Sequence, residues 1–360
     1  MRESKEYPVN PSSIPLFYPA KSKNYLLNAN DIRVADVWPF LRYTIKVARK
    51  NKKPFKSEER IFLLNLLEQA EYFFKTAADA PIKSQPLLYY YSFMNLAKVA
   101  INLDSYLGNG QKYNHGISDN ISLSTKLSNA QLTLWKSSNG SYSVSEYLLN
   151  MLENKSLSYN KIGSRNGIVF KIQELLRDCV GVSKTYCEIY NCPTVFYKLD
   201  NVRVYAKSKK MYFEATICEC DDSVKSKLVA RGYSVTKSTE DIYMLSSSCS
   251  VRTTSNPTIA EKHRLSKQLR DIGVWSYCDG DVYKLYISPV AGDLSSAAVI
   301  YHIMFFFGSI TRYHPDLFDE IISAKEYWLV SEFLKTQPIQ FLFYMVSKIN
   351  GSEILMSKQI

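Results

Sequence analysis

The sequence predicts an α+β protein that is mainly helical, with a helical lobe built from both chain ends and a small inserted α+β module. A long apolar helix pattern runs from 84 to 103, and helical patterns return after Pro289. Between them, from about residue 185, the spacing of apolar residues changes to the alternation typical of strands. Because 360 residues exceed what one hydrophobic core usually supports, we expect more than one folding unit.

These patterns divide the chain into three parts. Residues 1–183 should form an N-terminal arm and the helical lobe, because the Pro- and Asn-rich residues 1–35 favour an extended segment. Residues 184–288 should form the inserted module with its hairpins. Residues 289–360 should form helices that pack back on the helical lobe.

The stretch Ser84–Leu103 predicts a helix that is apolar on almost every side. Pro86 suits its first turn, where a missing N–H leaves no helical hydrogen bond unmade. Such a helix is normally buried among other helices. Three polar side chains at i, i+3 and i+6 form one narrow seam: Ser92, Asn95 and Lys98. The seam either fixes the helix register through hydrogen bonds of Asn95, or faces a pocket or a subunit interface.

A second helix is predicted at Ser57–Ala78, where apolar residues recur at spacings of three and four and Ser57 is a candidate N-cap. It should form an αα-hairpin with the central helix. A short helix is predicted within Asp31–Val47, broken at Pro39, followed by a basic loop at Arg49–Lys53. Weaker helical patterns lie at 123–134, 144–152 and 168–180.

The middle of the chain has the pattern of strands joined by tight turns. Alternating residues at 202–206 and 211–218 flank Lys207–Lys210, which predicts a hairpin. The dipeptide Asp279-Gly280 predicts another hairpin. Two further strands and two short helices are expected between these hairpins. The helical patterns after Pro289 lie at 294–310, 315–323, 324–336 and 338–349.

Composition and charge restrict the class of protein. The formal net charge is +11 and the pI is near 9.1, which favours an anionic partner. The seven cysteines and the lack of an apolar N-terminal segment indicate reduced thiols and a cytoplasmic protein. The apolar run Ala297–Ile310 is too short for a membrane span, so we expect a core helix there and no membrane contact.

Two parts of the sequence resemble the YaaC-like bacterial proteins. The first is SQPLLYYYSFMNLAKVA at 84–100, followed by HGIS at 115–118. The second is IYHIMFFFGSITRYHPDLFDEI at 300–321. The resemblance covers the helical lobe, is weak over the middle module, and implies no particular enzymatic activity.

The helical core is also remotely similar to HEPN domains, many of which are RNA-cleaving toxins or defence effectors. Their nuclease signature requires an Arg and a His five residues apart, so that both reach one scissile phosphate. The residues five positions before the four histidines are Gly110, Thr258, Ala297 and Ser309. Because none is an Arg, this similarity implies a helical scaffold without nuclease activity.

The sequence predicts neither a cofactor nor a metal site. It has no Walker A loop, GxGxxG, HExxH, GxSxG or CxxC motif. Four cysteines could in principle bind zinc, but their spacing fits no common zinc module, so we expect structural thiols: Cys187, Cys192, Cys218 and Cys220.

His115 and Arg312 are the candidate catalytic residues. His115 lies in a Gly-bounded loop, where an imidazole can act on a phosphate as acid, base or hydrogen-bond donor, or only complete a loop hydrogen bond. Arg312 follows an apolar helix and must be paired, either with a carboxylate such as Asp316 or Asp319, or at a functional site. In the functional interpretation both residues converge on one polar pocket with Asn95, Lys98, Ser92 and Tyr313.

Three basic clusters are candidates for a nucleic-acid-binding surface. They are Arg49–Lys53, the turn residues Lys207, Lys209 and Lys210, and a helical group of Lys262, Arg264, Lys267 and Arg270. Tyr205, Tyr212 and Trp275 lie nearby in sequence and are able to stack bases, as single-strand binders require. The alternative is that these charges are only solvated.

Three functions are consistent with these features. The first is a YaaC-like protein that acts by binding nucleic acid or a protein partner, as a component of a bacterial antiviral defence system. The second is a HEPN-related enzyme that acts on RNA or a nucleotide phosphate ester through His115 and Arg312. The third is a structural or regulatory subunit whose Tyr-rich surface binds a protein partner or forms a homo-oligomer.

Overall fold

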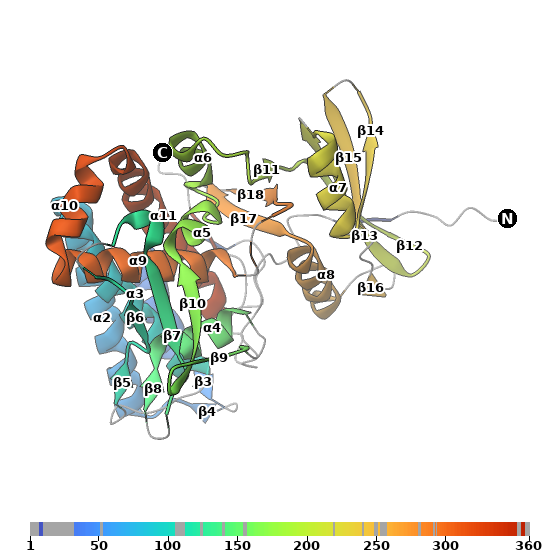
Figure 1. Ribbon diagram of the computed structural model, residues 1–360. Helices are drawn as coiled ribbons and strands as arrows, with labels where there is room; N and C mark the ends of the chain where they lie inside the picture. The colour runs from blue at the N-terminus through green and yellow to red at the C-terminus, as the bar shows by residue number, and fades with distance from the viewer. Residues whose placement is uncertain are drawn as a thin grey trace.

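The computed structural model is mainly helical with several small sheets, which confirms the predicted α+β fold class (Figure 1). Among the residues that the structure describes, helices account for 53% and strands for 25%. The structure describes residues 7–9, 32–50, 53–104, 112–122, 125–138, 141–153, 157–218, 220–239, 241–247, 251–252, 258–279, 282–290, 292, 294–350 and 354–356.

The helical lobe is organised around α3 (Gln85–Asp104), as the apolar pattern of this stretch predicts. α2 (Ser57–Asp79) precedes it, and the two helices form the predicted hairpin. At the start of α2, the Glu59 carboxylate accepts a hydrogen bond of 2.8 Å from the backbone N–H of Lys56. Ser57 is therefore the first residue of the helix and not its N-cap.

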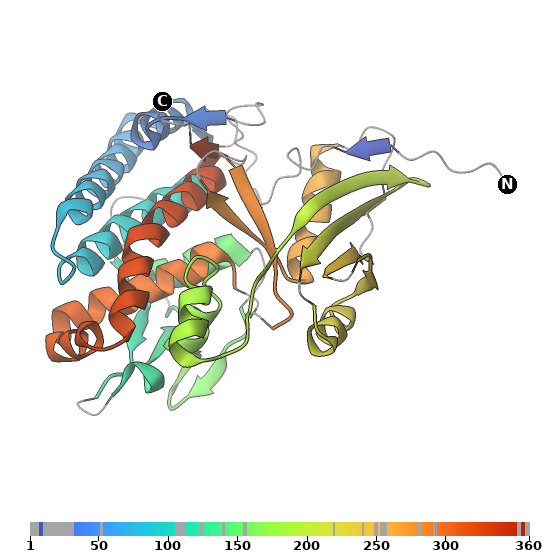
Figure 2. The same cartoon turned by 90° about the horizontal axis from the view of Figure 1, so that it is seen from above.

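Two helices from the C-terminal part of the chain pack against α3: α9 (Ser296–Tyr313) and α11 (Glu326–Asn350). Almost all of α9 is buried, which confirms its prediction as a core helix. Phe93 of α3 stacks on Phe341 of α11, with ring centroids 3.9 Å apart. Both ends of the chain thus contribute to one lobe (Figure 2). In the described part of the chain, no helix has the length and apolarity that a membrane crossing requires.

The predicted break in the last helix is wrong. α11 continues through Pro338, although a proline inside a helix removes one backbone hydrogen bond and clashes with the preceding turn. Leu334 and Phe341, one turn to either side of the proline, are both buried in the lobe. This packing holds the predicted segments 324–336 and 338–349 in one helix.

Pro39 does not break the first helix either. β2 (Ile32–Val34) is followed by α1 (Val37–Val47), and the Asp36 carboxylate caps α1 by accepting a hydrogen bond of 3.0 Å from the N–H of Trp38. Pro39 therefore lies in the first turn, where helical N–H groups have no partner within the helix. The break expected at Pro39 is wrong because the helix starts just before it.

A four-stranded sheet stands where two helices are predicted. β7 (Gln131–Trp135) pairs antiparallel with β10 (Arg165–Lys171), which leads into the short α5 (Ile172–Arg177). The three central residues of β7 are all buried, so the strand lacks the alternation that identifies strands in a sequence. The helices predicted at 123–134 and 168–180 are therefore wrong, apart from α5. The outer strands are β6 (Ile117–Asp119), next to β7, and β9 (Asn160–Ile162), next to β10.

Shorter elements complete the lobe. The helices predicted at 144–152 and 315–323 are confirmed as α4 (Val144–Glu153) and α10 (Pro315–Ser323). The basic segment 49–53, predicted as a loop, contains strand residues at both ends. The remaining elements are β3 (Arg49–Lys50), β4 (Lys53–Pro54), β5 (Tyr113–Asn114), the 3-10 helix η2 (Leu127–Asn129), β8 (Tyr142–Ser143), α6 (Ser183–Tyr190) and β19 (Ile354–Met356).

The inserted segment forms most of a six-stranded sheet and two helices (Figure 1). Its elements are β12 (Asp200–Lys207), β13 (Lys210–Cys218), α7 (Asp222–Ala230), β14 (Tyr233–Lys237), β15 (Ile242–Ser247), β16 (Val251–Arg252) and α8 (Ile259–Asp271). The strand order is β1-β12-β13-β15-β14, where β1 is Tyr7–Val9, and β16 also pairs with β13. The hairpin predicted across 207–210 is confirmed. α7 and α8 pack on one face of this sheet around Phe213.

A strand pair lies between the two hydrophobic cores. β17 (Val274–Asp279) pairs with β18 (Val282–Ile287), which confirms the hairpin, although the turn residues 280–281 lie outside the described residues. β11 (Tyr197–Lys198) extends this sheet. Trp275 and Cys278 are buried in the core of the lobe, whereas Val274 and Ile287 belong to the smaller core. The division of the chain after 183 and 288 stays a prediction.

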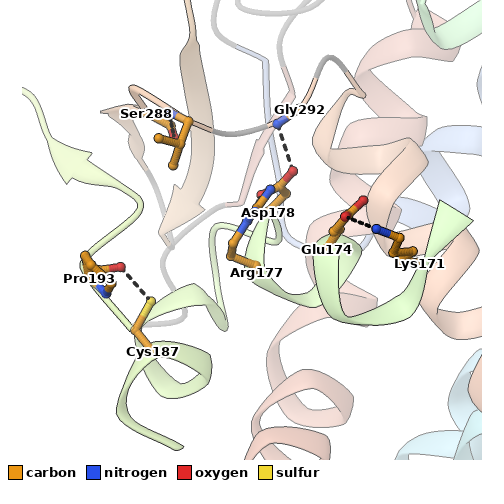
Figure 3. Close-up of polar contacts among 9 residues, drawn as sticks. Lys171, Glu174, Arg177, Asp178, Cys187, Pro193, Ser288 and Gly292 are labelled. Atoms are coloured by element: carbon orange, nitrogen blue, oxygen red, sulfur yellow. Dashed lines mark hydrogen bonds and ion pairs between the residues drawn. The ribbon is translucent and has the colours of Figure 1, made fainter. Parts of the chain in front are cut away.

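Polar contacts fasten the junction between the two cores. The Asp178 carboxylate accepts hydrogen bonds from the backbone N–H of Gly292 and from Nε of Arg177, each at 2.8 Å (Figure 3). On another side, Arg270 of α8 forms an ion pair with Glu153 of α4. The buried Glu153 also accepts a hydrogen bond of 2.8 Å from the N–H of Ser295, just before α9.

Candidate anion-binding site

A pocket of about 270 Å³ lies where α3 and α9 meet the segment that carries β5 and β6. Its wall combines tyrosine and phenylalanine rings with a cation, an imidazole and a carboxylate. The lining residues are Leu87, Tyr90, Tyr91, His115, Ile117, Ser118, Asp119, Phe305, Gly308, Ser309, Arg312, Tyr313 and His314. His115 and Arg312, which are far apart in the sequence, therefore share one pocket.

The backbone around His115 is fixed by close packing. Gly116 has φ +69°, and a Cβ at this position would lie 1.5 Å from Oγ of Ser143, so only glycine fits. The carbonyl of Gly116 accepts a hydrogen bond of 2.8 Å from the N–H of Trp135, and that of His115 accepts one of 3.2 Å from Ser145. These contacts fix the backbone that carries the imidazole into the pocket lining.

His115 packs on α3 and α9 through its ring. Its Nδ1 is hydrogen-bonded to the hydroxyl of Tyr90, and the two ring centroids are 5.6 Å apart. Partial burial lowers the pKa of His115, and the charges of Lys98 and Arg312 lower it further. Burial raises the pKa of Tyr90 well above its usual value. At neutral pH the imidazole is therefore uncharged and the phenol protonated.

Arg312 is held by aromatic residues. Its Nη1 donates a hydrogen bond of 2.8 Å to the hydroxyl of Tyr91, and its guanidinium lies over the ring of Tyr313, 4.9 Å from the centroid. No ion pair joins Arg312 to a carboxylate among the described residues. Asp319, one of the partners expected for it, pairs with Lys83 at 2.8 Å.

Another part of the pocket wall is polar. The hydroxyl of Ser309, one turn before Arg312, donates a hydrogen bond to the carboxylate of Asp119. Asp119 belongs to β6, so this contact joins the sheet to α9. The sequence prediction missed Tyr90, Tyr91, Ser309 and Asp119 as site residues. The helical spacing of Ser309 and Arg312 is a signal that identifies Ser309 as facing the same side.

Two residues of the polar seam of α3, Ser92 and Asn95, contact α2 and do not line this pocket. The hydroxyl of Ser92 donates a hydrogen bond of 2.7 Å to the carbonyl of Ala70, and Nδ2 of Asn95 donates one of 3.3 Å to Gln69. Both contacts are with α2, as expected of a seam that fixes helix register. Lys98 lies over the ring of Tyr113, 5.6 Å from the centroid, and burial lowers its pKa. None of the three lines the pocket, whereas Tyr313 does.

Two of the three predicted basic clusters belong to the segment around the smaller core, whereas the third, at 49–53, contributes residues to β3 and β4 of the lobe. Lys209 and Lys210 are exposed at the turn between β12 and β13, with Lys207 partly exposed beside them. Arg264 and Lys267 are exposed on α8, while Arg270 is engaged with Glu153. The side chain of Lys262 lies outside the described residues. Trp275 is buried, so its ring is not available to stack on a base.

The described cysteines do not gather into a metal site. Cys187 and Cys192 lie near one another at the end of α6, and the thiol of Cys187 donates a hydrogen bond of 3.2 Å to the carbonyl of Pro193 (Figure 3). Across the part of the chain that the structure describes, no group of three or more His, Cys, Asp or Glu side chains is placed to hold a metal ion.

Comparison with known proteins agrees with the resemblance carried by the helical lobe. Among curated proteins and among solved structures, no match to the chain was found. The model of the YaaC-like protein family, by contrast, matches residues 29–349. This match spans the lobe, the inserted segment and the C-terminal helices, and it shows that the chain belongs to the YaaC-like family.

Proposed function

We propose that this YaaC-like protein binds a small phosphate ester in the pocket between α3 and α9. The observation that supports this most directly is the environment of Arg312. Among the described residues, this guanidinium contacts the neutral side chains of Tyr91 and Tyr313, so it retains donors for an anion, and its planar fork matches phosphate oxygens. The volume of about 270 Å³ favours a ligand no larger than a nucleotide.

In this proposal His115 is a hydrogen-bond donor to the phosphate. The Tyr90 hydroxyl stays protonated and donates a hydrogen bond to Nδ1 of His115. Nδ1 is then the acceptor, so the proton of the neutral imidazole is on Nε2. That Nε2–H faces an anion together with Arg312. Tyr90 thereby positions His115 without touching the ligand.

Calorimetric titration with nucleoside monophosphates and with sulfate tests the proposal. Arg312→Gln should weaken binding by about tenfold or more, because a hydrogen bond to a charged group contributes roughly 1.5–3 kcal/mol. Arg312→Lys should recover part of the loss. Lys171→Gln, which removes an exposed charge from β10, is the matched control. Equal affinities of wild type and Arg312→Gln would contradict the proposal.

The second candidate is catalysis at the same pocket, with His115 acting on a phosphate ester as general acid or base. It is favoured by the same contact, because a hydrogen-bonded and oriented imidazole is what such catalysis requires. Turnover of a nucleotide or of RNA that disappears in His115→Gln, while sulfate still binds, would establish it. A role in bacterial antiviral defence is a further proposal, tested by phage plating on cells that carry the wild type or Arg312→Gln.

A further inference from the structure

The six-stranded sheet has one face that no described helix covers. Along β12 and β13, alternate residues enter the core beneath α7 and α8, including Val204, Met211 and Phe213. The residues between them lie on the other face. On this outer face Arg203 pairs in register with Glu214, Tyr205 with Tyr212, and Lys207 with Lys210.

The centre of this outer face is a stacked pair of tyrosines. The rings of Tyr205 and Tyr212 lie 5.4 Å apart between centroids with an angle of 22° between their planes. The guanidinium of Arg203 lies over Tyr205, 4.7 Å from the ring centroid. The Tyr205 hydroxyl donates a hydrogen bond of 2.9 Å to Glu214, whose charge is also offset by Arg203 at 3.7 Å. The rings are therefore held in a fixed orientation.

Positive charge gathers at one end of the stacked pair. Lys207, Lys209 and Lys210 surround the β12–β13 turn, and Arg252 of β16 lies opposite Lys210 in register. Lys209, Lys210 and Arg252 are exposed. Cations beside an aromatic platform are the arrangement that single-stranded nucleic acids require, because bases stack on the rings while phosphates meet the charges.

The turn itself carries a lysine in an unfavourable conformation. Ser208 has φ +51° and Lys209 has φ +61°, so both central residues are left-handed. Two-residue turns of this kind favour Asn-Gly, and a left-handed residue other than glycine costs roughly 1–2 kcal/mol. The turn therefore gains no stability from a lysine at position 209, so this residue can be replaced without loss of the hairpin.

The geometry points to this outer face as a binding surface for single-stranded nucleic acid, with a base stacked on Tyr212, whose ring Tyr205 supports, and phosphates at the lysine turn. The surface is separate from the pocket that holds Arg312. Arg270 is not part of this surface, because it forms an ion pair with Glu153 of α4. Duplex is disfavoured because paired bases expose no face on which a tyrosine ring can stack.

Fluorescence anisotropy with a labelled twelve-nucleotide oligo(U) or oligo(dT), and with a duplex of matched length, tests the platform. Tyr212→Leu keeps an apolar residue on the strand but removes the ring. We expect single-strand affinity to fall about five- to a hundredfold, since base stacking contributes roughly 1–3 kcal/mol. Lys227→Gln, an exposed charge on α7 beneath the opposite face, is the matched control and should leave affinity unchanged.

The double substitution Ser208→Asn with Lys209→Gly separates binding from folding. It installs the residues that the turn favours, so Tm should rise or stay constant while single-strand affinity falls. The slope of log Kd against log salt should decrease by about 0.7, as expected for one lost phosphate contact on a single strand. The proposal is overturned if duplex binds as tightly as single strand, if an acidic peptide competes equally well, or if Tyr212→Leu binds like the wild type. Arg312→Gln should not affect this binding.

Discussion

The two candidate residues in the pocket, His115 and Arg312, owe their chemistry to neutral neighbours. Tyr90 orients His115, and Tyr91 and Tyr313 hold Arg312, and within the described part of the chain no carboxylate pairs with either side chain. Arg312 and Tyr313 are both exposed, so an anion can reach the guanidinium from solvent. The tyrosine-rich stretch of α3 thus provides more than core volume, because two of its rings face the pocket.

Anion binding in the pocket should become tighter as the pH falls. The pKa of His115 is lowered from its ordinary value of 6.5. The ring is therefore neutral at pH 7 and becomes positively charged only at a pH below 6.5. Titrating sulfate, whose charge is constant between about pH 5 and 8, should give a Kd that decreases toward acid pH by up to about tenfold. His115→Gln should remove this dependence. Binding that is unchanged or weaker at acid pH would contradict a contact between His115 and the anion.

His302 should make the protein sensitive to acid. Burial lowers its pKa to about 4, and its Nδ1 is bonded to the carbonyl of Ala298 within α9. Above pH 6.5 the ring is neutral in both folded and unfolded chains, so it does not make stability depend on pH. Between pH 6.5 and 4 only the unfolded chain gains the proton, so the unfolding free energy should fall by about 3 kcal/mol.

Urea unfolding at pH 7 and pH 4.5 measures that effect. His302→Leu has no titrating ring, so its loss of stability between the two pH values should be smaller than that of the wild type. Identical losses for both proteins would show that other groups cause the acid sensitivity.

At the scale of elements, the close approach of α9 to α3 brings the pocket walls together. A Cβ on Gly308 would lie 3.1 Å from Cβ of Tyr90 and 3.3 Å from the carbonyl oxygen of Pro86. Gly308→Ala would otherwise favour the helix by up to about 1 kcal/mol. Here the two neighbouring atoms are the Pro86 carbonyl oxygen and Cβ of the buried Tyr90, and neither can move aside without moving the backbone. We therefore expect overpacking to destabilise the fold by a net amount of about 1–2 kcal/mol.

Thermal unfolding and sulfate titration of Gly308→Ala check this together. A lower Tm with weaker sulfate binding is the expected result, because α9 carries Arg312 and must move outward. A higher Tm would show that the two helices separate without strain.

The elements that the sequence predicts well are those whose pattern is local. The hairpin at 207–210 is identified by alternation and a short polar turn, and α3 by its continuous apolar surface. β7 is not predicted because it is buried on both faces, so its residues carry no alternation.

The sequence predicts the pocket only in part. His115 and Arg312 carry chemistry that is visible in a sequence, whereas Asn95 faces α2. Which face of an apolar helix meets which neighbour depends on tertiary packing, which no local pattern encodes.

At the scale of the whole molecule, the cationic side chains that give the net charge of +11 have different roles. Lysines at the β12–β13 turn are exposed, but Arg270, in a nearby helix, is used internally to join α8 to α4. The same helix therefore carries exposed cations on one side and a structural ion pair on the other. Net charge alone does not distinguish the two roles, because it reports neither burial nor partner.

The Glu153–Arg270 pair should be the strongest polar link between the lobe and the inserted segment. The Glu153 side chain is fully buried and Arg270 is 20% exposed. Arg270→Gln leaves a buried carboxylate without its cation and should lower the unfolding free energy by about 3 kcal/mol. Glu153→Gln should cost less, about 1–2 kcal/mol, because the amide oxygen still accepts from the N–H of Ser295 and water reaches Arg270.

Urea unfolding of the wild type, both single variants and the double variant measures the coupling between the two residues. The double variant should lose less unfolding free energy than the two single variants lose together. The reason is that Glu153→Gln removes the unpaired carboxylate that Arg270→Gln alone leaves buried. Arg270→Gln should also leave the salt dependence of oligonucleotide binding unchanged, because its guanidinium faces α4 and not the outer sheet face. Additive losses would show that the two cores are joined mainly by the apolar contacts of β17 and β18, with the ion pair contributing little.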